Sequence, residues 1–162
     1  MRKKKICMVG DFSVGKTSIT QKFVNNVFSE KYLTTIGVKI DTATVGEDKL
    51  IVWDVAGRDS LSPINASYLV GASGVILVAD GSRSSTVGVL LEIWQTVTNR
   101  IGSVPVVVAL NKADLDGWQI DDHSRALLDQ QGWDVFATSA KDGKNVEAVF
   151  KKLVEIMNCK ES

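Results

Sequence analysis

Short apolar runs alternate along the chain with stretches in which apolar residues recur at helical spacing. The runs at 74–80 and 104–110 are nearly continuous and rich in β-branched residues, as is typical of strands buried on both faces of a sheet. Four further strands are predicted, at 5–9, 38–45, 49–55 and 133–139. Gly46 lies between two of these runs and marks a hairpin turn.

Amphipathic helices are predicted between the strands. Apolar residues within 87–97 and within 146–157 fall on one helical face, and a further helix is expected from Gly15 to about Asn25. Alternating strands and helices predict an α/β fold, with a six-stranded, mostly parallel sheet and about five helices on its two faces. Ligands bind such sheets beyond the carboxyl ends of the strands. The loops that follow the strands should therefore carry the chemistry.

Length and charge narrow the class of protein. The chain has 162 residues, so we expect a single domain over residues 1–162. Its 19 Lys and Arg residues balance 19 Asp and Glu residues, so no global field favours nucleic acid. No apolar run reaches the roughly 20 residues of a membrane helix, and no secretory leader is recognisable. The two cysteines follow no metal-ligand spacing, and a reducing, cytoplasmic setting is expected.

The first loop reads "GDFSVGKTS" and lies between a predicted strand and a predicted helix. It matches a phosphate-binding pattern of two glycines followed by Lys16 and Thr17. The glycines allow backbone N–H groups to approach phosphate oxygens, and the helix directs its positive end at them. Lys16 would reach the β- and γ-phosphates, and the Thr17 hydroxyl would bind Mg²⁺. The residues expected to contact the nucleotide here are Asp11, Phe12, Ser13, Val14, Gly15, Lys16, Thr17 and Ser18.

The third strand ends in "DVAG", which supplies Asp54 and Gly57. The carboxylate would hold Mg²⁺ through water, and the Gly57 N–H would bond a γ-phosphate. Asp54 as a simple turn or helix cap is the alternative.

Two later loops point to guanine. In "NKAD", the Asp114 carboxylate would accept from the N1–H and 2-amino group of guanine. Adenine has neither donor, and would leave the carboxylate desolvated and unpaired. The Lys112 stem would cover the base, and Asn111 would tie this loop to the phosphate loop. An Asx turn with a solvated lysine is the alternative. In "TSAK", the predicted contacts come from Ser139, Ala140 and Lys141.

With these four loops in order, residues 5–159 resemble the small GTPases of the Ras superfamily, closest in spacing to the Rab and Roc-like branches. The resemblance implies a P-loop G domain that binds GTP or GDP with Mg²⁺. It also implies that Thr35 coordinates Mg²⁺ and the γ-phosphate, that Phe28 packs on guanine, and that Tyr32 closes over the phosphates. Effectors, an exchange factor and an activating protein would be its partners. Phe28 as a core aromatic residue at a helix end is the alternative for that position.

The sequence departs from the family pattern at two positions. Arg58 stands where the family usually has a water-orienting glutamine, and Phe12 stands where a small residue is usual. Arginine has no acceptor for the attacking water. Three outcomes stay open: weak hydrolysis, an arginine finger supplied in cis, or a charge that only faces solvent or an effector. A bulky Phe12 would obstruct an incoming arginine finger.

The sequence thus predicts a GTP-binding switch that hydrolyses GTP slowly. The predicted catalytic residues are Lys16, Thr35, Gly57 and Arg58, and the predicted metal ligands are Thr17, Thr35 and Asp54. A nucleotide-loaded adaptor with negligible turnover is the first alternative, and a phosphotransferase acting on a small acceptor is the second.

Three surface features complete the expectations. Cys159 has the formal spacing of a prenylation site, but Lys160 and Glu161 follow it, so no stable membrane anchor is predicted. Trp53 resembles the interswitch tryptophan of Rab proteins, with Ile40 and Leu69 as its altered companions. Trp94, Trp118 and Trp133 are expected to be packing residues.

Overall fold

The computed structural model describes residues 2–11, 13–26, 38–56 and 66–161, and the side chains within these ranges except that of residue 161. Its six strands form one sheet in the order β2-β3-β1-β4-β5-β6. The strands are β1 (Arg2–Gly10), β2 (Val38–Val45), β3 (Asp48–Val55), β4 (Gly74–Asp80), β5 (Val106–Asn111) and β6 (Asp134–Ala137). Only β2 pairs in the antiparallel sense, through the hairpin at Gly46.

The predicted strands are confirmed, two of them with the predicted bounds. β2 and β4 coincide with the runs at 38–45 and 74–80, because each run is followed directly by turn residues that begin with Gly46 and Gly81. β1 begins three residues earlier than predicted, at Arg2, since Arg2 pairs with Asp48 of β3 and extends the ladder. A parallel partner therefore lengthens a strand beyond its apolar run.

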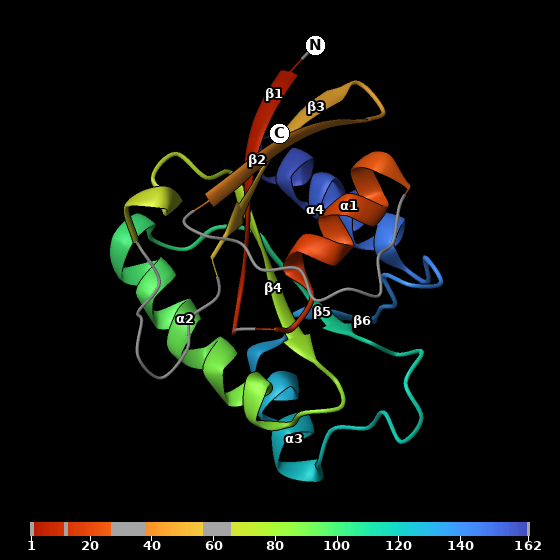
Figure 1. Ribbon diagram of the computed structural model, residues 1–162. Helices are drawn as coiled ribbons and strands as arrows, with labels where there is room; N and C mark the ends of the chain where they lie inside the picture. Colours follow the sequence, from red (N-terminus) through yellow and green to blue (C-terminus); the bar gives the residue numbers. More distant parts are fainter. Residues whose placement is uncertain (1, 12, 27–37, 57–65, 162) are drawn as a thin grey trace.

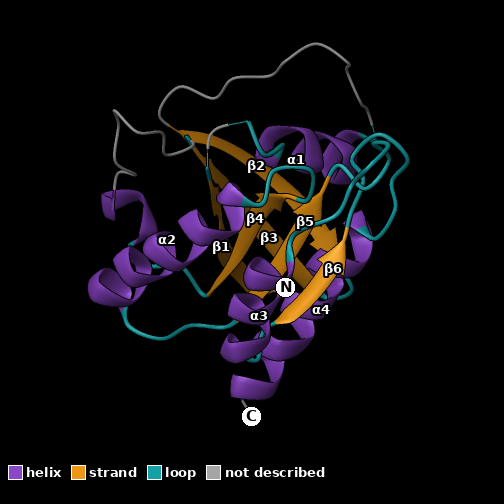
Figure 2. Ribbon diagram, turned by 90° about the horizontal axis from the view of Figure 1, so that it is seen from below, coloured by secondary structure: helices purple, strands orange, loops and turns teal. Residues whose placement is uncertain are grey.

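Four α-helices and one short 3-10 helix occur within the described ranges, against the expected total of about five. They are α1 (Lys16–Asn25), η1 (Ala66–Leu69), α2 (Ser85–Ile101), α3 (Asp122–Gln131) and α4 (Val146–Glu161). α1 lies beside α4 on one side of the sheet and α2 lies on the other (Figure 1). Figure 2 shows the strands enclosed by helices on both sides. Among the described residues, no helix has the length and apolar character needed to cross a membrane.

Alternation along the strands decides which face each side chain joins. In β1, Ile6 and Met8 pack into the core beneath α1 and α4, whereas Cys7 and Val9 pack into the core beneath α2 and α3. All four side chains are fully buried. The period of two thus fills both cores from a single strand, as a doubly covered sheet requires.

Local signals fix the helix ends. The Asp121 side chain accepts a 2.7 Å hydrogen bond from the Ser124 N–H and caps α3, which ends at Gly132 in the left-handed conformation. Gly15 directly precedes α1, with a φ of 98° and no side chain with which to cap the helix. The first turn of α1 also contains no acidic residue. The N–H groups at the start of α1 therefore face the phosphate loop without a capping side chain.

The surroundings of Trp53 differ from the expectation. Ile40 lies directly opposite Trp53 in the β2–β3 register, as a companion should. Leu69, however, is fully buried in the core beneath α2, and the Tyr68 ring lies 6.4 Å from the Trp53 ring instead. The Lys5 ammonium lies 3.6 Å above the Trp53 ring and donates to the Val70 carbonyl. The aromatic companion is therefore Tyr68, because the short helix η1 turns Leu69 inward.

Candidate functional site

The phosphate loop holds a buried cation. Lys16 is 6% exposed, and its Nζ donates to the carbonyls of Gly10 at 3.3 Å and Asp11 at 2.9 Å. Burial lowers the pKa of the Lys16 ammonium to about 8, against the opposing effects of Asp54 and Asp11. A buried ammonium beside a helix N-terminus is suited to binding an anion. The negative charge of the anion would stabilise the ammonium, which burial separates from water.

Both glycines of this loop are required by close neighbours. A Cβ on Gly10 would lie 2.2 Å from the Val78 carbonyl oxygen of β4. A Cβ on Gly15 would lie 2.3 Å from Asn111 Nδ2, and the φ of Gly15 also belongs to the left-handed region. The sequence motif by itself indicates only that these glycines allow the backbone to approach phosphate. The structure adds that they let the loop pack directly against the ends of β4 and β5.

Thr17 and Asp54 bring two oxygen donors together. Thr17 lies in the first turn of α1, and its hydroxyl donates a 2.5 Å hydrogen bond to Asp54 Oδ2 at the end of β3. Asp54 is fully buried. A hydroxyl and a carboxylate are the hard oxygen ligands that Mg²⁺ prefers, so the donor set fits this cation. The third predicted ligand, Thr35, lies outside the described residues.

Asn111 joins three loops. Its Nδ2 donates a 3.0 Å hydrogen bond to the Val14 carbonyl of the phosphate loop, and its Oδ1 accepts from the Thr138 hydroxyl at 3.1 Å. The side chain is buried at the end of β5. The link from Asn111 to the phosphate loop is the contact that the sequence predicted.

The Asp114 carboxylate is held at one oxygen. Ser139 Oγ donates a 2.9 Å hydrogen bond to Asp114 Oδ1, and the Asp142 N–H in turn donates to Ser139 Oγ at 3.0 Å. The Ala113 N–H donates to the Thr138 carbonyl at 2.9 Å, so backbone contacts join the same two loops. Ala140 is buried next to them. The "NKAD" and "TSAK" loops therefore form one unit that orients the Asp114 carboxylate.

Sequence reasoning missed two residues at this site. Asp80 Oδ2 lies 3.1 Å from the Lys112 ammonium, and Trp118 Nε1 donates a 2.8 Å hydrogen bond to the Asn111 carbonyl. Trp118 packs against the core beneath α2, as the sequence predicts, and its hydrogen bond is a role in addition to packing. One signal in the sequence could have indicated Asp80: it is the last residue of β4, and the other site residues also lie at the carboxyl ends of strands. No local pattern marked Trp118.

Six of the predicted site residues fall outside the described residues. They are Phe12, Phe28, Tyr32, Thr35, Gly57 and Arg58. Among the described residues, those of the phosphate loop and the two guanine-loop motifs lie at the carboxyl ends of β1 and β5 and after β6, as expected.

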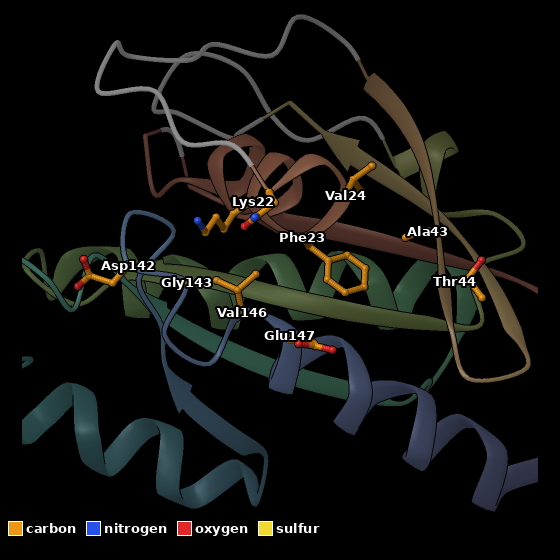
Figure 3. A pocket seen from close by; sticks show the side chains of 10 residues that line it. Lys22, Phe23, Val24, Ala43, Thr44, Asp142, Gly143, Val146 and Glu147 are labelled. Atoms are coloured by element: carbon orange, nitrogen blue, oxygen red, sulfur yellow. The ribbon is translucent and has the colours of Figure 1, made fainter.

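A separate hollow of about 570 Å³ lies between α1, β2 and the start of α4. Figure 3 shows the Phe23 ring within it, with Lys22 and Glu147 among the side chains around it. The Phe23 ring stacks on Phe150 with centroids 3.8 Å apart. None of its described lining residues belongs to the predicted nucleotide contacts. The pocket is thus distinct from the site built by the strand ends.

Comparison with known proteins agrees with this arrangement. A model of the Ras family matches residues 5–159. The chain is 36% identical to Ras-related protein Rab-3 of Caenorhabditis elegans, over 94% of this chain and 73% of that protein. It is 31% identical to Ras-related protein Rab-3C of Mus musculus, over 94% and 70% of the two chains. It is 30% identical to Ras-related protein Rab-3A of Homo sapiens, over 94% and 73%. The chain therefore belongs to the Ras family, as a small GTPase of its Rab branch.

Proposed function

We propose that residues 1–162 form one cytoplasmic GTP-binding domain that alternates between GTP- and GDP-bound states and hydrolyses GTP slowly. The observation that carries the proposal is the Asn111 side chain, which bonds the phosphate loop through Val14 and the "TSAK" loop through Thr138. One buried amide thus fixes the loop predicted to bind phosphate relative to the loops predicted to read the base.

The phosphate end would use the buried cation and the oxygen pair. Lys16, freed from the Gly10 and Asp11 carbonyls, would bond the β- and γ-phosphates. The Thr17 hydroxyl and Asp54 Oδ2 lie 2.5 Å apart. Together with Thr35, these two residues would hold Mg²⁺. When bound, Mg²⁺ would supply positive charge to the phosphate oxygens. The remaining loop residues assigned to phosphate contact would act mainly through backbone N–H groups.

The base end would select guanine. Asp114 would accept from the N1–H and the 2-amino group, and the Ser139 hydroxyl at 2.9 Å orients the carboxylate for this. The Ala140 N–H would meet the guanine O6, while Lys112, Lys141 and Phe28 would border the base. ATP offers no donor to Asp114, so the carboxylate would lose its solvent without a partner.

Hydrolysis would proceed by direct attack of water on the γ-phosphate, giving GDP and phosphate. Lys16, Thr35 and the Gly57 N–H would stabilise the charge on the transferring group. Arg58 can donate to the phosphoryl oxygens but cannot accept from the attacking water. The chemical step should therefore be slow, and the GTP-bound state long-lived enough to engage effectors. The presence of Arg58 and Phe12 at these two positions also favours a second candidate function. In it, the protein is an adaptor that stays loaded with GTP without useful turnover.

Two measurements test these functions. Titration calorimetry with Mg²⁺ should show GDP binding and no comparable binding of ADP; equal affinities would refute guanine recognition. Single-turnover hydrolysis of preloaded GTP should then be slow and should accelerate in Arg58→Gln. No hydrolysis in either form would leave the loaded adaptor as the function, and slower hydrolysis in Arg58→Gln would assign Arg58 to the role of a finger in cis.

A further inference from the structure

Two groups of contacts hold the "NKAD" loop, and both involve residues outside that motif. One group surrounds the Asn111 main-chain carbonyl, and the other surrounds the Lys112 ammonium. The contacts come from Asp80 at the end of β4, from Gly81 in the turn that follows it, and from Trp118, four residues beyond Asp114.

Trp118 closes over the turn after β4. The Asn111 carbonyl accepts from Trp118 Nε1 at 2.8 Å and from the Gly81 N–H at 3.0 Å. A Cβ on Gly81 would lie 1.9 Å from Trp118 Nε1, so the indole lies directly against the glycine backbone. The φ of Gly81 does not lie in the left-handed region. Glycine is required at this position because of the contact with the indole. The indole and Gly81 therefore fix the main chain at Asn111 from two sides.

Asp80 anchors the next residue of the loop. Its side chain is 2% exposed, and its Oδ2 lies 3.1 Å from Lys112 Nζ and 3.0 Å from Arg83 Nε. Its Oδ1 accepts from the Ser82 N–H at 2.8 Å and from the Ser82 hydroxyl at 2.6 Å. Burial by itself raises the pKa of Asp80, but the hydrogen bonds from Ser82, Arg83 and Lys112 outweigh it and hold the pKa below its usual range. The carboxylate is therefore charged at neutral pH and faces the ammonium as a full ion pair.

Lys112 has a backbone conformation that needs such support. Its φ is 69°, in the left-handed region that non-glycine residues occupy at a cost. The ion pair with Asp80 fixes the side chain at one end, and the Asn111 carbonyl contacts fix the preceding peptide. Both sets of contacts thus hold the two residues, Asn111 and Lys112, that lead into Asp114.

We propose that Asp80 and Trp118 are positioning residues for guanine recognition, acting through Lys112 and Asn111 to set base selectivity and the rate of nucleotide release. The proposal rests on the proposed function, since it assigns a role within the same site. Within the described ranges, the side chains of Asp80 and Trp118 bond Ser82, Arg83, Asn111 and Lys112, none of which is assigned to the phosphates. The chemical step should therefore be insensitive to both.

The first test replaces Asp80 and compares it with a matched carboxylate. Asp80→Asn should reduce the preference for GDP over inosine diphosphate, which lacks the 2-amino group, by about tenfold, as expected for disturbing one hydrogen bond to a charged group. Asp48→Asn is the control, because Asp48 is also buried and also pairs with an arginine at 3.0 Å, but at the opposite end of the sheet. It should lower stability without changing the GDP preference.

The second test removes one N–H and keeps an aromatic ring. Trp118→Phe should accelerate GDP release by about five- to tenfold, on the same reasoning for a lost buried hydrogen bond. Single-turnover hydrolysis of preloaded GTP should stay within about twofold of the unchanged protein. Trp94→Phe is the control, since Trp94 is likewise half-buried but packs on Trp133 with ring centroids 5.7 Å apart. It should leave the release rate unchanged.

The outcomes separate this inference from the function on which it rests. If the unchanged protein does not prefer GDP to ADP, the proposed function fails. If it does, but Trp118→Phe and Asp80→Asn keep both the release rate and the GDP preference, the two residues are merely structural and the inference is wrong. Equal slowing of hydrolysis and acceleration of release would also overturn it. Should Asp80→Asn fail to fold, the Trp118→Phe rates decide alone.

Discussion

Asn111 Nδ2 donates a 3.0 Å hydrogen bond to the carbonyl of Val14, 97 residues earlier in the chain. The bond crosses from the end of β5 to the loop after β1, over β4, which lies between them in the sheet. Both partners are buried. A loop that would bind phosphate and a loop that would bind a base are thereby made parts of one rigid site.

Asn111→Ala should lower the free energy of unfolding by about 1–3 kcal/mol, because it leaves the Val14 carbonyl and the Thr138 hydroxyl buried without their partner. Urea denaturation measures this. GDP release should accelerate in the same variant. Asn25→Ala is the control, because Asn25 is exposed and bonds Gln21 on the surface of α1. Equal stability of the two variants would contradict the role assigned to Asn111.

Gly15→Ala should abolish nucleotide binding and destabilise the fold. The new Cβ would lie 2.3 Å from Asn111 Nδ2, and the φ of 98° would be strained. Gly46→Ala isolates the strain, since Gly46 has a φ of 59° with nothing within 4 Å of the added Cβ. It should cost about 1–2 kcal/mol of unfolding free energy and leave nucleotide binding intact. Nucleotide binding by Gly15→Ala with normal affinity would show that the loop tolerates the displacement of Asn111.

Nucleotide affinity should fall as the pH rises through about 8, where Lys16 in the ligand-free protein loses its proton. A bound phosphate favours the charged ammonium, so binding above this pH requires uptake of a proton. The loss is at most about tenfold per pH unit. GMP is the control, because it shares the base but lacks the β-phosphate that Lys16 would reach. Parallel pH profiles for GDP and GMP would contradict this account.

The same titration has a consequence for stability. The pKa of Lys16 is about 8 in the folded protein and near its ordinary value of roughly 10.4 in the unfolded chain. Between these values the unfolded state binds more protons, so the contribution of Lys16 to stability increases with pH across this window. Lys16→Met, which keeps the stem and removes the charge, should flatten this part of the ligand-free stability profile in thermal unfolding.

Thr17→Ala should remove the dependence of GDP retention on Mg²⁺. The unchanged protein should release GDP faster when EDTA removes the metal, whereas the variant should release it quickly with or without the metal, because its hydroxyl ligand is missing. Stopped-flow release in both conditions gives the ratio. Thr96→Ala is the control, since Thr96 bonds the Glu92 carbonyl in the middle of α2, away from the site. A Mg²⁺ effect that persists in Thr17→Ala would exclude Thr17 as a ligand.

The strands and the motifs of the candidate site followed from local patterns. The runs at 38–45 and 74–80 coincide with β2 and β4, and the capping residue Asp121 directly precedes α3. Alternation and capping depend on neighbours within a few residues, so a sequence reveals them directly. Because β1 and β5 are parallel, the loops that follow them lie at the same end of the sheet. The contact between Asn111 and the phosphate loop could therefore be predicted.

The contacts of Asp80, Trp118 and Tyr68 were decided by tertiary structure alone. Asp80 meets Lys112 because β4 and β5 are neighbours in the sheet and pair Asp80 with Asn111, and Trp118 reaches the Asn111 carbonyl because Gly81 has no side chain to exclude it. The low pKa of Lys16 likewise requires burial that no local pattern states. Sequence periodicity determined where each strand ends and which motifs follow it. Which side chains then meet across those ends was fixed by strand order and close packing, since both depend on residues far apart in the chain.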